Sequence, residues 1–278
     1  MFYTTSEYTN HTGLGSKLFA WGRAKVLQKA FDVKMLQQQW ISIRGAGVTR
    51  GGIDYSKILG KIYLFNNFKN DEGEISWLEW QLNLKRKFPT FFVNNLSEAL
   101  EALAGDNKLI VFRWHGGHYF TDLENYRLLL HESLLRITRT AVFKTIIHPK
   151  PFIGINIRLG NDFVDPNSGQ GGHYRTPMDW FLRNIEEVRK LHGNLPIYVV
   201  SDGTQHQLAP FKKFPNVTLV NHNYAIQDLL FLTQASVYMG VGTSTFSAWA
   251  SFLGNMPSYA AEVTPFSGFQ LKNAHELP

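Results

Sequence analysis

The 278-residue sequence predicts an α/β fold built on parallel sheets. Short apolar runs of strand length alternate with segments that carry apolar residues at helical spacing, which is typical of strands joined by helical crossovers. Glycines and polar residues follow directly after several apolar runs, as they do where parallel strands end and ligands bind. Hydrophobic residues make up 44% of the chain and charged residues 18%, the composition of a folded, core-forming protein.

The length allows one large domain or two modest ones. We expect two, residues 1–145 and residues 146–278, with the joint at Pro149-Lys-Pro151. The first part holds 19 Lys/Arg against 13 Asp/Glu, whereas the second holds nine of each. A basic half favours an anionic partner, such as a phosphorylated ligand or an acidic membrane surface. The scattered basic residues lack the spacing with aromatic residues that a nucleic-acid face needs, so no nucleic-acid partner is expected.

The sequence contains no cysteine, which excludes disulfides and thiolate metal sites. No apolar run approaches the ~20 residues of a membrane span, and no signal peptide is visible. The chain is therefore expected to lack a transmembrane segment and to be cytoplasmic. Peripheral contact with the inner face of a membrane is left open.

The first half begins with a strand expected at residues 1–4 and a helix that follows Gly13-Leu-Gly15 and runs to about Phe31. Gly-x-Gly at a helix start lets a ligand approach the backbone closely, and a tight loop before a core helix is the equal alternative. The acidic run from Asp71 to Glu74 is expected to be a solvated loop. Further strands are expected at 61–65, 91–93 and 109–114, and further helices at 75–88, 97–104 and 123–138.

The second half repeats the alternation of strands and helices. Strands are expected at 152–158, 196–201, 216–220, 237–241 and 257–261, and helices at 176–191, at 229–235 and after Ser244. The carboxyl ends of parallel strands meet at one edge of a sheet, where ligands bind. Arg158, Asp202 and residues 242–245 are therefore expected to meet at that edge.

The segment from Gly240 to Thr245 predicts a phosphate seat, with an ordinary capped helix as the alternative. A strand that breaks on glycine and restarts as a helix at Ser/Thr leaves backbone N–H groups pointing outward. Arg158 adds a planar fork that can bind a pair of phosphate oxygens and keeps its charge. Because the chain has no Asp-x-Asp pair, a diphosphate site neutralised by arginine and a helix dipole, without metal, fits better.

Several blocks carry a resemblance to a known family. The segment 154–162 resembles the H-x-R-x-G-D strand-end motif of the GDP-fucose-dependent fucosyltransferases, and it is most similar to the α-1,2-fucosyltransferases. The segment 244–253 resembles their S-S/T-F-S-W-W-x-A-x-L block, and the segment 228–235 resembles the D-L-x-L-M/L-S-x-A/C helix before it. Three further segments, 13–19, 117–120 and 199–203, each resemble a motif of the family, and all the segments occur in the same order along the chain as in the family.

The resemblance implies a GT-B-like fold with two Rossmann-like halves whose parallel sheets face a cleft. It implies metal-independent, inverting transfer of fucose from GDP-fucose to a glycan or lipid-linked oligosaccharide, with no cofactor. Arg158 would bind the β-phosphate, and Asp228 would contact guanosine. The donor-binding residues expected are Gly13, Gly15, Asn156, Arg158, Asp202, Asp228, Ser244, Thr245 and Phe246.

The chain departs from the family pattern at four positions. Asn156 stands where the family motif has histidine, and Leu159 stands where it has a basic or polar residue. Asn161 replaces the motif aspartate, with Asp162 one position later, and Ser16 replaces the asparagine of the N-terminal block. Another nucleotide sugar, or a relative that binds without catalysis, therefore stays open as an alternative.

Inverting transfer needs a base within reach of the acceptor hydroxyl. Asp162 is the expected catalytic base, because among the carboxylates of this loop it lies nearest the strand end. Arg158 is the expected catalytic cation. Asp165 and His173 are the other candidates, and some relatives work with no dedicated base.

Overall fold

The computed structural model describes most of the chain as two compact units. The described residues are 2–7, 13–36, 40, 68–76, 79, 88–105, 107–113, 119–140, 151–160, 163–164, 173–222, 224–261 and 274–275. Those up to Thr140 belong to the first unit, and those from residue 151 on belong to the second. Each unit has its own sheet and core.

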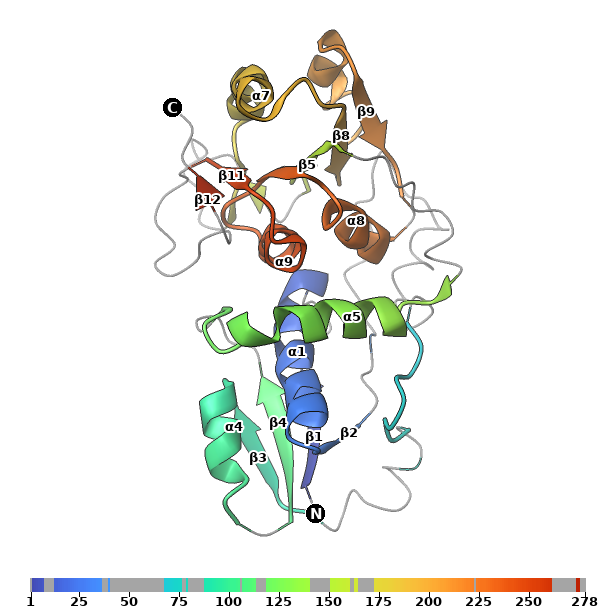
Figure 1. The fold of residues 1–278 in the computed structure, drawn as a ribbon, viewed down its shortest axis with the longest axis vertical. Coiled ribbons are helices and arrows are strands. Elements are labelled where there is room, and N and C mark those ends of the chain that lie inside the picture. The colour runs from blue at the N-terminus through green and yellow to red at the C-terminus, as the bar shows by residue number, and fades with distance from the viewer. Residues whose placement is uncertain are drawn as a thin grey trace. The chain divides into compact units, whose positions relative to one another are not determined.

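The first unit is built on a four-stranded parallel sheet in the order β2-β1-β4-β3 (Figure 1). The strands are β1 (Phe2–Glu7), β2 (Lys34–Met35), β3 (Thr90–Val93) and β4 (Lys108–Arg113). The helices are α1 (Leu14–Ala30), α4 (Leu96–Ala102), the 3₁₀ turn η3 (Glu124–Tyr126) and α5 (Arg127–Ile137). The strand expected at 61–65 and most of the helix expected at 75–88 lie outside the described residues.

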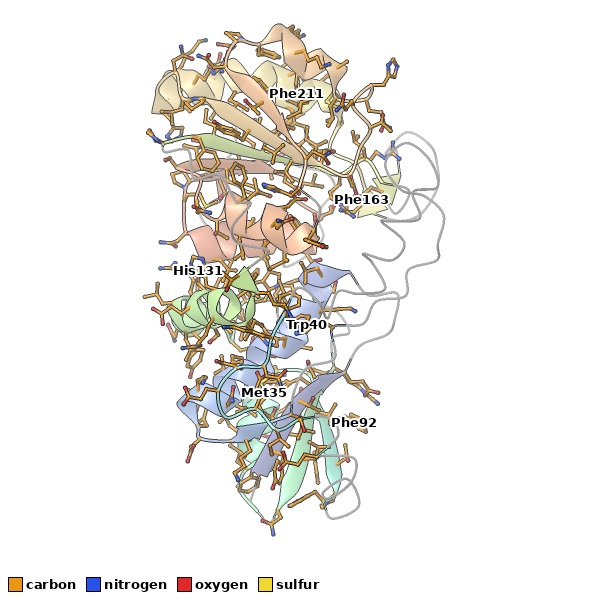
Figure 2. All side chains as sticks on the ribbon, turned by 90° about the vertical axis from the view of Figure 1, so that its right-hand side faces the viewer. Met35, Trp40, Phe92, His131, Phe163 and Phe211 are labelled. Carbon is orange, nitrogen blue, oxygen red and sulfur yellow. The ribbon has the colours of Figure 1, made fainter. Side chains whose placement is uncertain are left out.

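Helix α1 is buried along most of its length. Leu14, Leu18, Trp21 and Leu27 are buried as their helical spacing predicts. The expectation that Phe31 belongs to the same face is wrong, because the helix ends at Ala30 and Phe31, its C-cap, is 39% exposed. Met35 and Trp40, labelled in Figure 2, are buried in this unit beside the helix.

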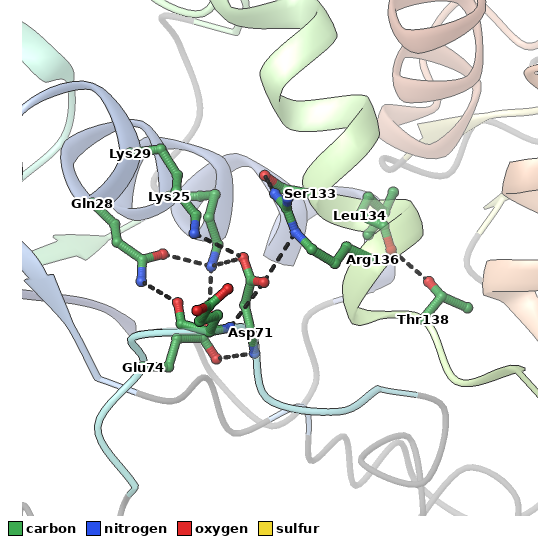
Figure 3. Close-up of polar contacts among 10 residues, drawn as sticks. Lys25, Gln28, Lys29, Asp71, Glu74, Ser133, Leu134, Arg136 and Thr138 are labelled. Atoms are coloured by element: carbon green, nitrogen blue, oxygen red, sulfur yellow. Dashed lines mark hydrogen bonds and ion pairs between the residues drawn. The ribbon is translucent and has the colours of Figure 1, made fainter.

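A buried ion cluster ties α1 to the turn at 71–74 and to α5 (Figure 3). The Nζ of Lys25 lies 2.5 Å from Glu74 and 3.3 Å from Asp71, and it donates to Gln28 over 2.7 Å. Arg136 Nε lies 3.0 Å from Asp71 Oδ1. The predicted solvated loop is therefore wrong for Asp71 and Glu74, whose carboxylates are buried because a buried lysine needs several acceptors, whereas Glu72 and Gly73 between them are exposed.

The second unit is built on a six-stranded parallel sheet in the order β12-β11-β10-β5-β8-β9. Its strands are β5 (Ile153–Ile157), β8 (Ile197–Ser201), β9 (Val217–Val220), β10 (Val237–Gly240), β11 (Ser258–Ala260) and β12 (Ala274–His275). Its helices are α7 (Met178–His192), the 3₁₀ helix η5 (Ala209–Lys213), α8 (Ala225–Leu232) and α9 (Thr245–Gly254), and β6 (Phe163–Val164) pairs with β7 (His173–Tyr174). The helix expected to have Thr176 as its N-cap and Pro177 as its first residue begins one residue later, at Met178, with Pro177 as its N-cap.

Helices cover both faces of this sheet, with α7 on one face and α8 and α9 on the other (Figure 1). Ile155 and Met239 join Phe181 and Val188 of α7 in one buried cluster, which also contains Phe211 and Phe163, labelled in Figure 2. On the opposite face Phe152 stacks on Phe231 of α8, with ring centroids 5.0 Å apart. The predicted α/β class with parallel sheets is confirmed.

The order of the strands creates a switch point. The chain passes from β5 to β8 and β9 on one side, then returns to β10 and continues to β11 and β12 on the other side of β5. The two crossovers leave β5 and β10 in opposite directions, and ligands of open α/β sheets bind at the carboxyl ends of such a strand pair.

Candidate functional site

Polar residues form a row across the carboxyl edge of the second sheet. The pairing of β5 with β8 ends at Ile157 and Ser201, and the pairing of β8 with β9 ends at Val200 and Val220. If this register continues just past the strand ends, Arg158, Asp202 and His222 come to corresponding positions at the edge of the sheet. The pairing of β10 with β5 brings Gly242 to the corresponding place on the other side of Arg158. The site therefore lies at the carboxyl edge of the second sheet.

Arg158 is held between a carboxylate and an aromatic ring. Its Nη1 lies 2.9 Å from Asp202 Oδ2, and its Cζ lies 4.9 Å from the ring centroid of Phe163. The side chains of Arg158 and Asp202 are 20% and 23% exposed, so the guanidinium is oriented yet open to an anion from solvent.

Asp202 also fixes the backbone next to Arg158. Its Oδ1 accepts the N–H of Leu159 over 2.7 Å, which joins the ends of β5 and β8. Gly203 packs against the same leucine: a Cβ there would lie 3.1 Å from Leu159 Cβ and 3.2 Å from its Cγ, and would overlap its Cδ1. The two strand ends are thus closely fitted, and glycine is the residue that this contact admits.

The start of α9 is anchored to β5. Ser244 is the N-cap, and its Oγ accepts the N–H of Ser247 over 3.4 Å. The Oγ of Ser247 donates to Asn156 Oδ1 over 2.9 Å and accepts the N–H of Val241 over 3.2 Å. The first turn of α9 itself carries no acidic residue that would offset the positive end of its helix dipole.

Two residues of this first turn, Thr245 and Phe246, are partly exposed. Asn156, in contrast, is 3% exposed and its side-chain oxygen bonds to Ser247. This placement gives Asn156 a supporting role under α9, and its contact with a donor stays a prediction.

Asp228 forms a buried pair with His222. The Nδ1 of His222 lies 2.8 Å from Asp228 Oδ1, and the two side chains are 8% and 9% exposed. The imidazole also packs edge-on against Phe231, with centroids 5.4 Å apart. The sequence pattern does not single out His222, although this residue comes two positions after the expected strand 216–220, at the same edge as the other candidates.

The remaining candidates lie elsewhere. Gly13 and Gly15 belong to the first unit, where Gly13 is the N-cap of α1 and Gly15 is buried. Asp162 and Asp165 lie outside the described residues, as does the side chain of His173. Within the described ranges, no group of three or more His, Cys, Asp or Glu side chains is placed to hold a metal ion. Among the helices that the structure describes, none is both long and apolar enough to cross a bilayer.

Solved structures share the fold of this chain at low sequence identity. The NodZ alpha-1,6-fucosyltransferase soaked with GDP-fucose matches with a TM-score of 0.54 and 14% identity, over 92% of this chain and 92% of that one. POFUT1 in complex with GDP-fucose matches with a TM-score of 0.52 and 10% identity, over 94% and 97% of the two chains. An Arabidopsis thaliana FUT1 variant in complex with GDP matches with a TM-score of 0.50 and 12% identity, over 93% and 70%. These likenesses confirm the GT-B-like fold.

At the level of sequence, a comparison with curated proteins finds no match. The family model described as glycosyl transferase family 11 matches residues 82–277, well over half of the chain. The protein is therefore a glycosyltransferase that belongs to glycosyl transferase family 11.

Proposed function

We propose that the protein transfers fucose from GDP-fucose to a hydroxyl group of a glycan or a lipid-linked oligosaccharide. The observation that carries the proposal is that Arg158 and the start of α9 follow the neighbouring strands β5 and β10 at the switch point of the second sheet. A guanidinium fork and a helix N-terminus are complementary to a diphosphate. Family membership and the bound GDP-fucose of similarly folded proteins support this choice of donor.

The donor would lie along the row of strand ends. The diphosphate would contact Arg158 and, through backbone N–H groups and hydroxyls, the turn from Ser244 to Phe246. The nucleoside would extend across β8 towards β9, about 10 Å away at two strand spacings. Asp228 would meet the guanine base there, because a carboxylate can accept both the N1–H and the 2-amino group.

The reaction would be an inverting displacement. The acceptor oxygen forms a bond to the anomeric carbon while the bond from that carbon to the β-phosphate oxygen breaks. The proton of the acceptor hydroxyl passes to a base, for which Asp162 is the candidate. Arg158 contributes by stabilising the negative charge that builds up on the departing GDP, a charge greater in the transition state than in the bound donor.

We propose that this chemistry needs no metal or other cofactor, because the sequence lacks an Asp-x-Asp pair and Arg158 with α9 can neutralise the leaving group. The absence of cysteine suits a reducing compartment, so we place the activity in the cytoplasm, where the acceptor could lie at the inner face of a membrane.

A donor panel tests the proposal. A bound ligand stabilises the folded protein by about 2.7 kcal/mol at a concentration of 100 Kd. GDP and GDP-fucose are expected to raise the melting temperature, whereas UDP and UDP-sugars are expected to leave it unchanged. Release of GDP from GDP-fucose, measured with a panel of glycan acceptors, then tests transfer.

Each alternative has its own result. A rise in melting temperature with UDP and none with GDP would show that the donor is a UDP-sugar. The replacement of the motif histidine by Asn156 is compatible with such a donor. Stabilisation by GDP-fucose with neither hydrolysis nor transfer would make the protein a binding relative. No shift with any nucleotide would refute the diphosphate site.

A further inference from the structure

We infer that His222 is a positioning residue: it holds the Asp228 carboxylate in the orientation that reads the donor base, and so sets the preference for guanine. The inference rests on the proposed function, since it concerns the same nucleotide site. It adds a residue that lies outside every motif block recognised in the sequence.

The geometry defines what His222 does. An ionised carboxylate can only accept hydrogen bonds, so the 2.8 Å contact places the proton on His222 Nδ1, which donates to Asp228 Oδ1. The imidazole is itself fixed from a second side by the ring of Phe231. A carboxylate whose one oxygen is tied to a fixed N–H cannot rotate freely, so its second oxygen keeps one direction.

The pair is not needed to start α8. The backbone N–H of Tyr224, at the N-cap, already donates to Gln227 Oε1 over 3.0 Å, and Gln227 N–H donates to the carbonyl oxygen of Tyr224 over 3.0 Å. The helix therefore has its own cap inside the segment that joins it to β9. The bond between His222 and Asp228 is not part of this capping, so its role needs a separate explanation.

The position of the pair supplies that explanation. His222 is the last member of the row formed by Arg158 and Asp202, two strands away from the diphosphate seat. A nucleotide whose phosphates contact Arg158 and whose sugar passes Asp202 would bring its base to this end of the row. Both members of the pair are nearly excluded from water, where hydrogen bonds discriminate most strongly between ligands.

The chemistry identifies the base. Guanine presents two adjacent donors, N1–H and the 2-amino group, which match the acceptor-only carboxylate. Hypoxanthine keeps N1–H and lacks the amino group, so GDP and IDP differ by the one donor that an oriented carboxylate would detect. Pyrophosphate lacks the base altogether and reports on the phosphate seat alone.

Calorimetric titration of GDP, IDP and pyrophosphate into the wild type, His222→Asn, His222→Gln and His222→Ala tests the inference. The asparagine amide can occupy the place of Nδ1 and keep the donor, whereas the glutamine amide reaches the place of Nε2. We expect the wild type and His222→Asn to prefer GDP over IDP about tenfold. We expect His222→Gln and His222→Ala to lose most of this preference, with pyrophosphate binding unchanged in all four proteins.

Two results would overturn the inference alone: a GDP/IDP ratio near one in the wild type, or a ratio in His222→Ala equal to that of the wild type. Loss of the ratio in His222→Asn, with an unaltered melting temperature, would also overturn it. If the wild type bound no GDP at all, the proposed function would fail first.

Discussion

The contact between Gly203 and Leu159 gives the sharpest mechanical test of the site. The Gly203→Ala substitution adds a Cβ that would lie 3.1 Å and 3.2 Å from Leu159 Cβ and Cγ, and would overlap Cδ1. Leu159 is partly buried and packs against the apolar core of the second unit, so a shift of its side chain disturbs that contact. Overpacking of this kind costs about 1–3 kcal/mol.

The same displacement should reach the ligand site. The N–H of Leu159 bonds to Asp202 Oδ1 over 2.7 Å, and Arg158 is the preceding residue. A shift of Leu159 therefore moves both members of the ion pair that would face the diphosphate. We expect the melting temperature to fall by about 2–12 °C, from about 2–4 °C per kcal/mol for a chain of this size. GDP affinity should fall about tenfold, the equivalent of one charge-assisted hydrogen bond.

Scanning calorimetry and titration with GDP measure the two effects. Gly105→Ala is the matched control, because it lies in the other unit and the nearest atom to its added Cβ would be the Nζ at the far end of the Lys108 side chain. It should leave GDP affinity unchanged. If Gly203→Ala and Gly105→Ala behaved alike in both measurements, the argument that Gly203 positions the strand ends would be refuted.

Two further predictions concern stability. Burial raises the pKa of Asp71, but Lys25 and nearby hydrogen-bond donors outweigh burial and hold the pKa below the usual 3.8. The ionised carboxylate therefore stabilises the folded state fully above about pH 5, and this stabilisation is lost as the pH falls below about 4. Asp71→Asn should thus melt below the wild type at pH 7 by a margin that shrinks towards pH 3, and a constant margin in melting curves across this range would contradict the assignment. Ser244→Ala removes the N-cap of α9 and should lower the free energy of unfolding by about 0.5–1 kcal/mol. This is the lower part of the range for caps, because the bond to Ser247 N–H is 3.4 Å long. Urea denaturation that shows an unchanged free energy of unfolding would argue against the cap.

The second sheet was largely predictable from the sequence, for a physical reason. Buried parallel strands read as continuous apolar runs, and the polar residue that ends each run marks the carboxyl edge. The apolar runs therefore place Arg158, Asp202 and Ser244 at one edge without any knowledge of the strand order. His222 follows the strand run 216–220 at the same edge, but only the fold shows that it pairs with Asp228.

The first unit was harder to predict because its polar residues are buried. Lys25, Asp71 and Glu74 look like surface residues in the sequence, and only the fold brings them together in a buried cluster. Phe31 was assigned to the buried face by periodicity alone, yet the helix stops one residue earlier. Such errors arise where tertiary pairing or a helix end overrides the local pattern.

The central claim is that Arg158 binds the diphosphate of the donor, and GDP binding to Arg158→Ala tests it most directly. Removing the guanidinium removes hydrogen bonds from a charged group, which costs about 1.5–3 kcal/mol of binding free energy. The Kd for GDP is therefore expected to be about 10–150-fold larger than that of the wild type. Arg183→Ala is the matched control, since Arg183 is exposed on α7 and its Nε bonds only weakly to the carbonyl oxygen of Asp179, at 3.3 Å. We predict that GDP affinity falls in Arg158→Ala and is unchanged in Arg183→Ala, with guanosine affinity equal in both; equal GDP affinities in the two variants would contradict the account.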